Sequence, residues 1–577
     1  MAVMFIDQLQ EIIAHALQKE GLSVPAGTIT LEHPSTLSLG DFATNVALIH
    51  AKDTQTNPHT FAEKIVAHIN GMDIPFLSRI EVAGPGFINF FLSTTFFASK
   101  IESILENKSE YGLHNIFGGK KFMIEYTDPN PFKEFHIGHL MSNIIGEALS
   151  RLYEFAGAEV IRASYQGDMG LNVAQAIWGM KEEWKNMPLP DAPISERIRF
   201  LGASYSKGAQ AYADSPEIAD AIREINKKVF ARSDQDINHL YDTGRSWSLE
   251  HFEEIYSILG TRFDHSYFES EVQEIGVRLV REGLARGVFT ESEGAVVYRG
   301  EDDGLHTRVF LNKEGLPTYE AKELGLAERK EETEKFDTSI IVTANEQKSY
   351  MEVVLAAQRK LNPEAATKVR HITHGLMKLP SGKMSSREGN VVAATDFISR
   401  VRGLVYQKIA ERTMPELRKQ KIADEVAVGA IKYSILRQAI GTDIVFDFEK
   451  SISFEGDSGP YLQYSYTRAR SLLSRAAEEM PRALTAGLPE GWEASPLERL
   501  LARFPEIVEN AARAHAPHTI VTYLTELASA FNSFYGEEKI VGSLHAHAPY
   551  KVVLTYAFAT VMQNGLYILG IPVPEAM

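Results

Sequence analysis

The chain has 577 residues and contains no cysteine. Disulfide bonds and thiolate metal sites are therefore excluded, which favours a cytoplasmic enzyme. The sequence also lacks an apolar run long enough to cross a membrane, so we expect no membrane partner. Its first helical pattern carries Asp7 and Glu11, and we interpret it as neither a signal peptide nor a transit peptide.

An excess of positive charge is missing as well. The formal net charge is −17 at pH 7, and such a mean field repels phosphate, so the chain is not a general polyanion binder. Any contact with RNA must then come from local basic and aromatic patches. Because 44% of the residues are hydrophobic, the chain can bury several cores, and roughly two to four domains are expected.

One stretch organises the chain: residues 128–139 read DPNPFKEFHIGH, between an apolar strand-like run and a helix-like run. A strand, a turn and a helix start are where α/β proteins bind phosphate, because free N–H groups and the positive helix end meet there. Imidazolium groups on His136 and His139 could follow charge on phosphate oxygens, and Gly138 would let a nucleotide approach the backbone. These features predict an ATP site.

Two plainer interpretations of the histidine pair remain. His136 and His139 have the spacing of two metal ligands on one helical face, but such a site needs a third and usually a fourth ligand. Without cysteine to supply one, we predict no protein-bound metal. Two surface histidines at a helix start are also common, and these two residues alone do not exclude that interpretation.

The neighbouring residues carry a resemblance. The segment resembles the His-Ile-Gly-His signature of class I aminoacyl-tRNA synthetases, and Asn130 and Lys133 are similar to the pattern of the arginyl-tRNA synthetases. The resemblance implies that His136, Gly138 and His139 bind ATP. It also implies that Asn130 orients the main chain of arginine.

A second signature follows at residues 383–387, which read KMSSR. Alone, this could be a basic surface turn. It resembles the Lys-Met-Ser-Lys-Ser signature of class I synthetases, which implies ATP contacts from Lys383, Met384 and Ser385. Lys383 and Arg387 could neutralise charge that moves to the leaving pyrophosphate. Serine stands where the signature has its second lysine. The resemblance implies that Lys133 takes part in its place, and how Lys133, Lys383 and Arg387 share the work stays open.

Substrate selection is expected further along the chain. Tyr319 and Glu323 lie four residues apart on one helical face, which alone indicates a solvated helix. The resemblance implies that they hold the arginine side chain, because a carboxylate with aromatic walls selects a planar guanidinium over lysine. The family usually has aspartate at the position of Glu323. Glu269 is implied as a second acid and Gln347 as a polar partner, and Asp168, after a strand, would hold a substrate amine or ribose.

The N-terminal part reads as a small α/β module with a helix stopping at Gly21, a helix through 42–51 and two strands around a Gly-Pro-Gly turn. Its segments GDFATN and GPGFINF resemble landmarks of the N-terminal domain of arginyl-tRNA synthetases, which touches the tRNA elbow. Phe87 and Asn89 are expected to be exposed, stacking on an unpaired base and reading its edge.

The C-terminal part reads as helical throughout, which is also typical of a scaffold or dimerisation domain. Tyr461, Gln463 and Tyr464, with arginines after them, resemble instead the start of the family's anticodon-binding domain. The predicted fold is multidomain α/β, with these parts: a tRNA-binding accessory domain (1–110), a Rossmann-like catalytic domain (111–395) with an insertion near 184–295, a helical connecting region (396–455) and an all-α anticodon-binding domain (456–577).

The resemblance as a whole implies an arginine-tRNA ligase. ATP and L-arginine would give arginyl-adenylate, and the 2′-hydroxyl of the terminal adenosine of tRNA(Arg) would take the arginyl group, with Mg²⁺ accompanying ATP. We expect a cytoplasmic monomer. Another class I synthetase, such as the glutamyl or cysteinyl enzyme, would lack the N-terminal landmarks, and a non-catalytic tRNA-binding paralogue would have little reason to keep His136, His139 and Lys383 together.

Overall fold

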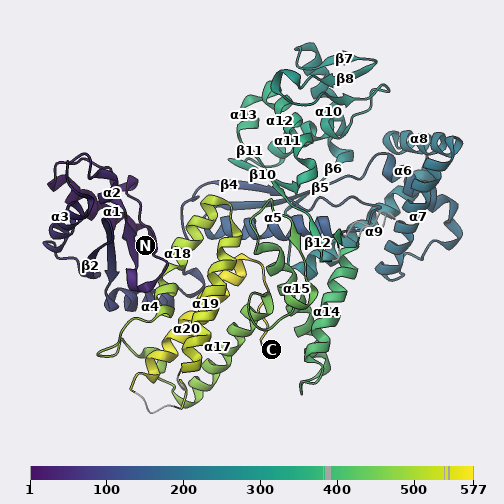
Figure 1. Cartoon of the computed structure of the whole chain (residues 1–577). Coiled ribbons are helices and arrows are strands. Elements are labelled where there is room, and N and C mark those ends of the chain that lie inside the picture. The colour runs from purple at the N-terminus through teal and green to yellow at the C-terminus, as the bar shows by residue number, and fades with distance from the viewer. Residues whose placement is uncertain (1, 381, 384–391, 538–539, 543–545, 576) are drawn as a thin grey trace.

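The computed structural model describes residues 2–380, 382–383, 392–537, 540–542, 546–575 and 577 (Figure 1). Over these ranges, no helix is long and apolar enough to cross a membrane.

A five-stranded parallel sheet forms the centre of the molecule, in the order β11-β10-β4-β5-β6. The chain enters at β4 and then continues to one side through β5 and β6 and to the other through β10 and β11, so the strand order reverses between β4 and β10. The carboxyl ends of strands at such a switch point leave a crevice in which α/β proteins bind ligands. The strands are β4 (Lys121–Glu125), β5 (Glu159–Gln166), β6 (His265–Phe268), β10 (Thr338–Ala344) and β11 (Val369–His374).

Helices cover both faces of this sheet, as a parallel sheet requires (Figure 1). Along β4, Phe122 and Ile124 belong to the core shared with α5, whereas Met123 packs on the opposite face with residues of α10 and α11. The covering helices are α5 (Ile137–Phe155) on one face and α10 (Glu269–Ala285), α11 (Tyr319–Thr333), α12 (Lys348–Leu361) and α13 (Pro363–Thr367) on the other.

The N-terminal part has its own antiparallel sheet, β1-β3-β2, and its own core. Asp41 fastens it to the C-terminal part: one carboxylate oxygen accepts a 2.8 Å hydrogen bond from the Leu92 N–H, and the other forms an ion pair with Arg499 of α18. The elements are α1 (Ala2–Lys19), β1 (Phe42–Thr44), α2 (Val46–His50), α3 (Pro58–Asn70), β2 (Leu77–Ala83), β3 (Phe87–Leu92) and α4 (Thr94–Asn107).

Two further units are inserted in the sequence between successive strands of the central sheet. A helical arm with a separate core projects from it between β5 and β6, and a small antiparallel sheet of β7, β8 and β9 packs beside α11 (Figure 1). The arm consists of α6 (Leu171–Glu182), α7 (Ile194–Asp214), α8 (Pro216–Ala231) and α9 (Gln235–Leu259), and the small sheet of β7 (Thr290–Ser292), β8 (Ala295–Tyr298) and β9 (Arg308–Leu311).

The C-terminal part is helical, and its core is continuous with that of the catalytic part, since Ile145 of α5 and Phe558 of α20 belong to the same buried cluster. Its elements are β12 (Met377–Leu379), β13 (Gly382–Lys383), α14 (Ala394–Ile409), α15 (Glu416–Leu436), β14 (Ile444–Val445), α16 (Phe448–Ser451), α17 (Gly459–Glu479), α18 (Pro496–Ala514), α19 (Pro517–Glu537) and α20 (Ala548–Ile568).

The predicted fold class is confirmed: a Rossmann-like sheet lies between a small α/β unit and a helical bundle. One expected element is wrong. The helix predicted through residues 42–51 is strand β1 followed by the short α2, because Phe42 to Thr44 pair with Phe90 to Ile88 of β3. Pairing with a distant strand overrides a local pattern that is too short to distinguish helix from strand.

Candidate active site

The turn after β4 is held in an unusual backbone conformation. Thr127, Asp128 and Phe132 have positive φ angles of 80°, 49° and 67°. Side chains from distant elements fix this turn: the Thr127 N–H donates to the Ser142 hydroxyl (2.9 Å), and the Phe132 N–H donates to the Ser248 hydroxyl (2.9 Å). Strain of this kind persists only where surrounding contacts impose it, and it is common at functional sites.

The two histidines cap α5 reciprocally. Nδ1 of His136 accepts the backbone N–H groups of Gly138 (3.1 Å) and His139 (3.4 Å), and Nδ1 of His139 accepts the His136 N–H (3.3 Å). The rings stack with centroids 3.6 Å apart. Because Nδ1 is an acceptor in both rings, the proton of each neutral imidazole lies on Nε2. Gly138 makes room for this arrangement, since a Cβ there would lie 2.9 Å from Cε1 of His136.

Both histidines are neutral at pH 7. Burial, and then the charge of Lys133, lower the pKa of His136 to about 4. Burial lowers the pKa of His139 well below its ordinary value, and His136 and Lys133 lower it further. The expectation that the two histidines are imidazolium groups is therefore wrong for the protein without a bound ligand. The pair presents two uncharged Nε2–H donors, which suits hydrogen bonding to phosphate without proton transfer.

The second signature segment returns to this turn. Residues around Ala393 pair with the histidine turn: His136 and Ala393 form an antiparallel bridge, the Ile137 N–H donates to the Val392 carbonyl (3.3 Å), and the Ala394 N–H donates to the Phe135 carbonyl (2.8 Å). The segment that starts at Lys383 thus ends beside His136. Lys383 itself lies in β13. The other signature residues are outside the described part of the chain: Met384, Ser385, Ser386 and Arg387.

Lys133 lies close to both histidines, since its charge lowers their pKa values. Its Nζ is 5.1 Å from the ring centroid of Tyr205 on the helical arm, and burial lowers the pKa of the lysine itself. A partly buried ammonium for which the described residues provide no ion pair is well suited to an anionic ligand.

Asn130 and Glu269 meet at Gly167, at the carboxyl end of β5. The Asn130 Oδ1 accepts the Gly167 N–H (3.1 Å), and a Cβ at Gly167 would lie 2.3 Å from that oxygen and 3.4 Å from Oε1 of Glu269. Glu269 is buried and forms a 2.6 Å ion pair with Lys322. Burial raises the pKa of Glu269, and Lys322 partly offsets that rise.

Glu323 lies deeper, near Glu125 at the end of β4. Burial raises the pKa of Glu323 to about 8, with Glu125 as the next cause and Lys330 acting against it. Lys330 forms a buried ion pair with Glu125. Tyr319, at the start of α11, is 54% exposed, so the expected aromatic wall is open on that side. Gln347 is exposed in the turn between β10 and α12.

Four residues that surround Glu323 are not among the predicted site residues. They come from four elements and share the carboxyl edge of the sheet: Glu125, Tyr165, Lys330 and Tyr350. Glu125 had a signal, because a single acid ended an otherwise apolar strand-like run. The other three gave none, because a tyrosine or a lysine in a regular element is ordinarily structural.

Asp168 does not serve as a substrate contact. Its fully buried carboxylate accepts hydrogen bonds from the Tyr241 hydroxyl (2.9 Å), Nε of Arg245 (3.1 Å) and both the N–H and hydroxyl of Ser270 (3.0 and 2.8 Å). The expectation that it holds an amine or a ribose is wrong. It joins the helical arm to the start of α10, next to Glu269.

The predicted RNA contacts are only partly at the surface. Phe87 is 40% exposed, but Asn89 is buried in the middle strand of the N-terminal sheet, so its predicted exposure is wrong. Gln463 is also buried and donates to the carbonyls of Glu425 (3.1 Å) and Pro572 (2.8 Å), which corrects its expected RNA contact. Tyr464 is half-buried and accepts a hydrogen bond from Arg468 (3.1 Å).

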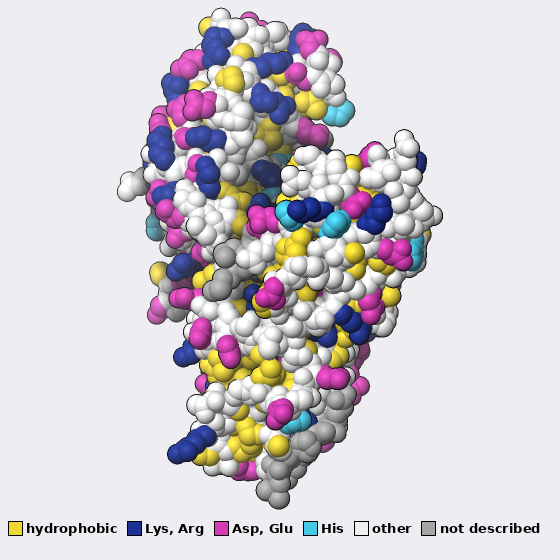
Figure 2. Space-filling model, turned by 90° about the vertical axis from the view of Figure 1, so that its left-hand side faces the viewer, with side chains coloured by type: hydrophobic (Ala, Val, Ile, Leu, Met, Phe, Trp, Pro, Cys, Tyr) yellow, Lys and Arg dark blue, Asp and Glu magenta, His cyan; other side chains and the backbone are white. Residues whose placement is uncertain are grey.

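Tyr461 is half-buried on the same helix, and its hydroxyl accepts from Nδ2 of Asn532 (3.0 Å). Charges of both signs are interspersed over the face drawn in Figure 2. That distribution agrees with the net charge and leaves RNA contact to local groups.

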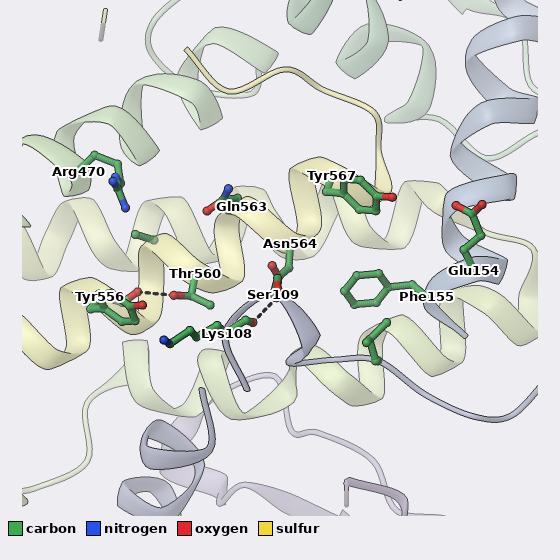
Figure 3. Close-up of a pocket in the computed structure, with 12 residues that line it drawn as sticks. Lys108, Ser109, Glu154, Phe155, Arg470, Tyr556, Thr560, Gln563, Asn564 and Tyr567 are labelled. Atoms are coloured by element: carbon green, nitrogen blue, oxygen red, sulfur yellow. Dashed lines mark hydrogen bonds between the residues drawn. The ribbon is translucent and has the colours of Figure 1, made fainter. Parts of the chain in front are cut away.

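A groove of about 490 Å³ lies elsewhere, between α20, α17, the end of α5 and the chain around Lys108 (Figure 3). It reaches Glu154 and Phe155, at the opposite end of α5 from His136. The groove is therefore separate from the nucleotide turn.

Comparison with known proteins agrees with the fold and with the two signature segments. The chain matches the models of three families: "tRNA synthetases class I (R), catalytic domain" over residues 100–448, "DALR anticodon binding domain" over 462–577 and "Arginyl tRNA synthetase N terminal domain" over 7–92. It is 31% identical to an arginine–tRNA ligase of Treponema denticola, covering 95% of each chain, and 28% identical to one of Halothermothrix orenii, covering 99% of this chain and 100% of that one. The structure resembles Thermus thermophilus arginyl-tRNA synthetase with a TM-score of 0.78 and 24% identity, covering 99% of both chains.

Proposed function

Because this chain belongs to the class I arginyl-tRNA synthetases, we propose that arginine and ATP react in the crevice at the carboxyl edge of its central sheet. The enzyme is an arginine–tRNA ligase. The observation that carries the proposed site is the bridge between His136 and Ala393, which supports joint action of the two signature segments on one nucleotide.

The reaction has two steps. A carboxylate oxygen of L-arginine attacks the α-phosphorus of ATP, and the bond to the β,γ-pyrophosphate breaks, giving arginyl-adenylate. The 2′-hydroxyl of the terminal adenosine of tRNA(Arg) then attacks the arginyl carbonyl, loses its proton and displaces AMP. In both steps the protein's main task is to place the reactants and to stabilise phosphate charge.

The histidine turn provides that stabilisation for ATP. His136 and His139 donate hydrogen bonds from Nε2–H to phosphate oxygens, and Gly138 keeps the rings seated against the start of α5. Lys133 supplies positive charge beside them, and Lys383, Met384, Ser385 and Arg387 are proposed to contact the phosphates. When bound with ATP, Mg²⁺ would supply positive charge that balances the phosphates. It would be held chiefly by the phosphates and water, as is usual for this ion.

The arginine site lies at the ends of β4 and β5. Asn130 orients the amino acid's main chain, while Glu269 and Glu323 attract its guanidinium, with Tyr319 and Gln347 at the rim. Glu323 supports this role best, because Glu269 and Glu125 are each already paired to a lysine. A guanidinium offers planar donors that match a carboxylate in two parallel hydrogen bonds.

For tRNA, Phe87 is proposed to stack on an elbow base and Tyr461 and Tyr464 to face anticodon bases. We propose that the enzyme acts as a monomer in the cytoplasm, where translation uses its product. The overall test is aminoacylation of total tRNA with each amino acid in turn. Charging with arginine alone is expected; charging with another amino acid, or none, would contradict the proposed function.

Lys133 and Lys383 are expected to act redundantly on the phosphates. Because either ammonium can offset part of the charge, the remaining lysine should compensate in each single alanine variant. Each single variant should therefore lose less activity than the double variant. Lys133→Ala/Lys383→Ala should lose more than the product of the single losses. Pyrophosphate exchange measures this. Lys378→Ala is a control, since Lys378 lies opposite Lys383 in the β12–β13 hairpin but its ammonium pairs with Asp443, next to β14. Single losses that simply multiply would mean that the two lysines serve different steps.

Phe87→Ala is expected to raise KM for tRNA about tenfold, because stacking on one base is worth about 1–3 kcal/mol. KM for arginine and for ATP should not change, since Phe87 lies in the N-terminal sheet. Phe87→Trp keeps a stacking surface and should retain most of the affinity. An unchanged KM for tRNA in Phe87→Ala would remove this residue from the RNA interface.

A further inference from the structure

Tyr165 is a buried tyrosine whose hydroxyl has no hydrogen-bond partner within the described part of the chain. It lies one residue before the end of β5, and its backbone N–H donates to the Asp128 carboxylate (2.8 Å). The side chain is 9% exposed, and among the described residues none forms a hydrogen bond with its hydroxyl. A buried hydroxyl without a partner costs about 1–3 kcal/mol, so it calls for an explanation.

The surroundings of this hydroxyl are those of the proposed arginine site. Tyr165 packs on the face of the sheet covered by α10 and α11, and Gly167, two residues later, touches Asn130 and Glu269. Burial raises the pKa of Tyr165, and the nearby carboxyls of Glu269, Glu323 and Glu125 and the phenol of Tyr350 raise it further.

The site has few acceptors to spare for a guanidinium, which carries five N–H donors. Lys322 pairs with Glu269 and Lys330 with Glu125, so Glu323 is the acid of this group most available to a ligand. One carboxylate accepts at most two of the five donors in the bidentate arrangement. A neutral oxygen nearby would take another N–H without adding charge.

We propose that the Tyr165 hydroxyl is a further arginine-binding and specificity-determining group. In the complex with arginine, its oxygen accepts an N–H of the guanidinium. The inference rests on the proposed function, because it places the substrate side chain between Glu323 and β5. It also explains why a polar group without a partner is kept in a buried strand.

Tyr165→Phe tests the inference, because it removes only the hydroxyl. A hydrogen bond to a charged group is worth about 1.5–3 kcal/mol, so KM for arginine in aminoacylation should rise roughly tenfold or more, with kcat and KM for ATP nearly unchanged. Tm of the free variant should equal or exceed that of the native enzyme, since an unsatisfied buried group is removed. The increase in Tm caused by arginine should shrink.

Tyr267→Phe is the matched control. Tyr267 pairs in register with Tyr165 on β6 and is also buried, and among the described residues its hydroxyl likewise has no hydrogen-bond partner. It lies near Thr333, which is ten residues and about 15 Å along α11 from Glu323. Its arginine KM should stay at the native value. An unchanged arginine KM in Tyr165→Phe, or equal rises in the KM for arginine and ATP with a fall in Tm, overturns the inference. Absence of arginine charging by the native enzyme would instead contradict the proposed function.

Discussion

His136→Ala and His139→Ala should each lower kcat/KM for arginine-dependent pyrophosphate exchange roughly a hundredfold or more, the usual scale for one lost contact to a transition state. Each substitution removes an Nε2–H donor at the nucleotide turn. Binding of tRNA should persist, because both residues lie at the start of α5, away from the proposed RNA contacts. Near-native exchange in both variants would exclude this turn as the ATP site.

The capping role of these histidines needs its own control. Nδ1 of His136 caps α5, and replacing a cap by alanine costs about 1 kcal/mol of stability. His136→Asn keeps a good cap but has no Nε2–H. It should recover the Tm of the native enzyme without recovering exchange. If His136→Asn restores activity, the effect comes from helix capping, and the phosphate contact is refuted.

A pH profile separates the neutral pair from an imidazolium mechanism. The pKa of His136 lies near 4, so its protonation state is constant from about pH 6 upward. Below that range, protonation of Nδ1 breaks the reciprocal caps. If a charged imidazole is required, the activity should fall as the pH rises through about 6.5, and His136→Asn should not show this pH dependence.

Much of the fold follows from local sequence patterns. The apolar run at Phe122–Tyr126, the turn and the following helix predict a strand-turn-helix unit, and the structure contains it as β4 and α5. Which residues of a strand are buried is harder to predict. Phe87 and Asn89 lie on one side of β3, but Asn89 is enclosed by β1 and β2 on either flank. The position of a strand within its sheet decides burial, and that position is absent from the local pattern.

The burial of polar side chains could not be predicted either, because it also depends on contacts between distant parts of the chain. Gln463 looks like a surface residue on a helix, yet its amide satisfies the carbonyls of Glu425 and Pro572, which come from distant parts of the chain. Asp168 likewise looks like a ligand because it follows a strand, but three side chains from the arm and α10 enclose it. In both residues the partners exist only after folding.

Glu323→Gln should weaken arginine binding by about 3–5 kcal/mol, because the ligand's cation is then buried without its charged acceptor. ATP affinity should barely change, since in the proposed site Glu323 would lie at the far end of the amino acid from the phosphates. Titrating each ligand separately measures both effects. Glu323→Asp, the usual family residue, is the control and should keep most of the affinity.

The pH dependence of arginine binding provides an independent test of the same residue. Burial raises the pKa of Glu323 to about 8, so the carboxyl is protonated in much of the free enzyme at pH 7. Guanidinium binding favours the carboxylate and releases that proton. Arginine affinity should therefore rise with pH up to about pH 8, by at most tenfold per pH unit for one proton, and then level off. Glu323→Gln has no proton to release, so its affinity should not vary over this range. If native arginine affinity is flat between pH 6 and 8, or if Glu323→Gln lowers ATP affinity instead, Glu323 does not hold the guanidinium.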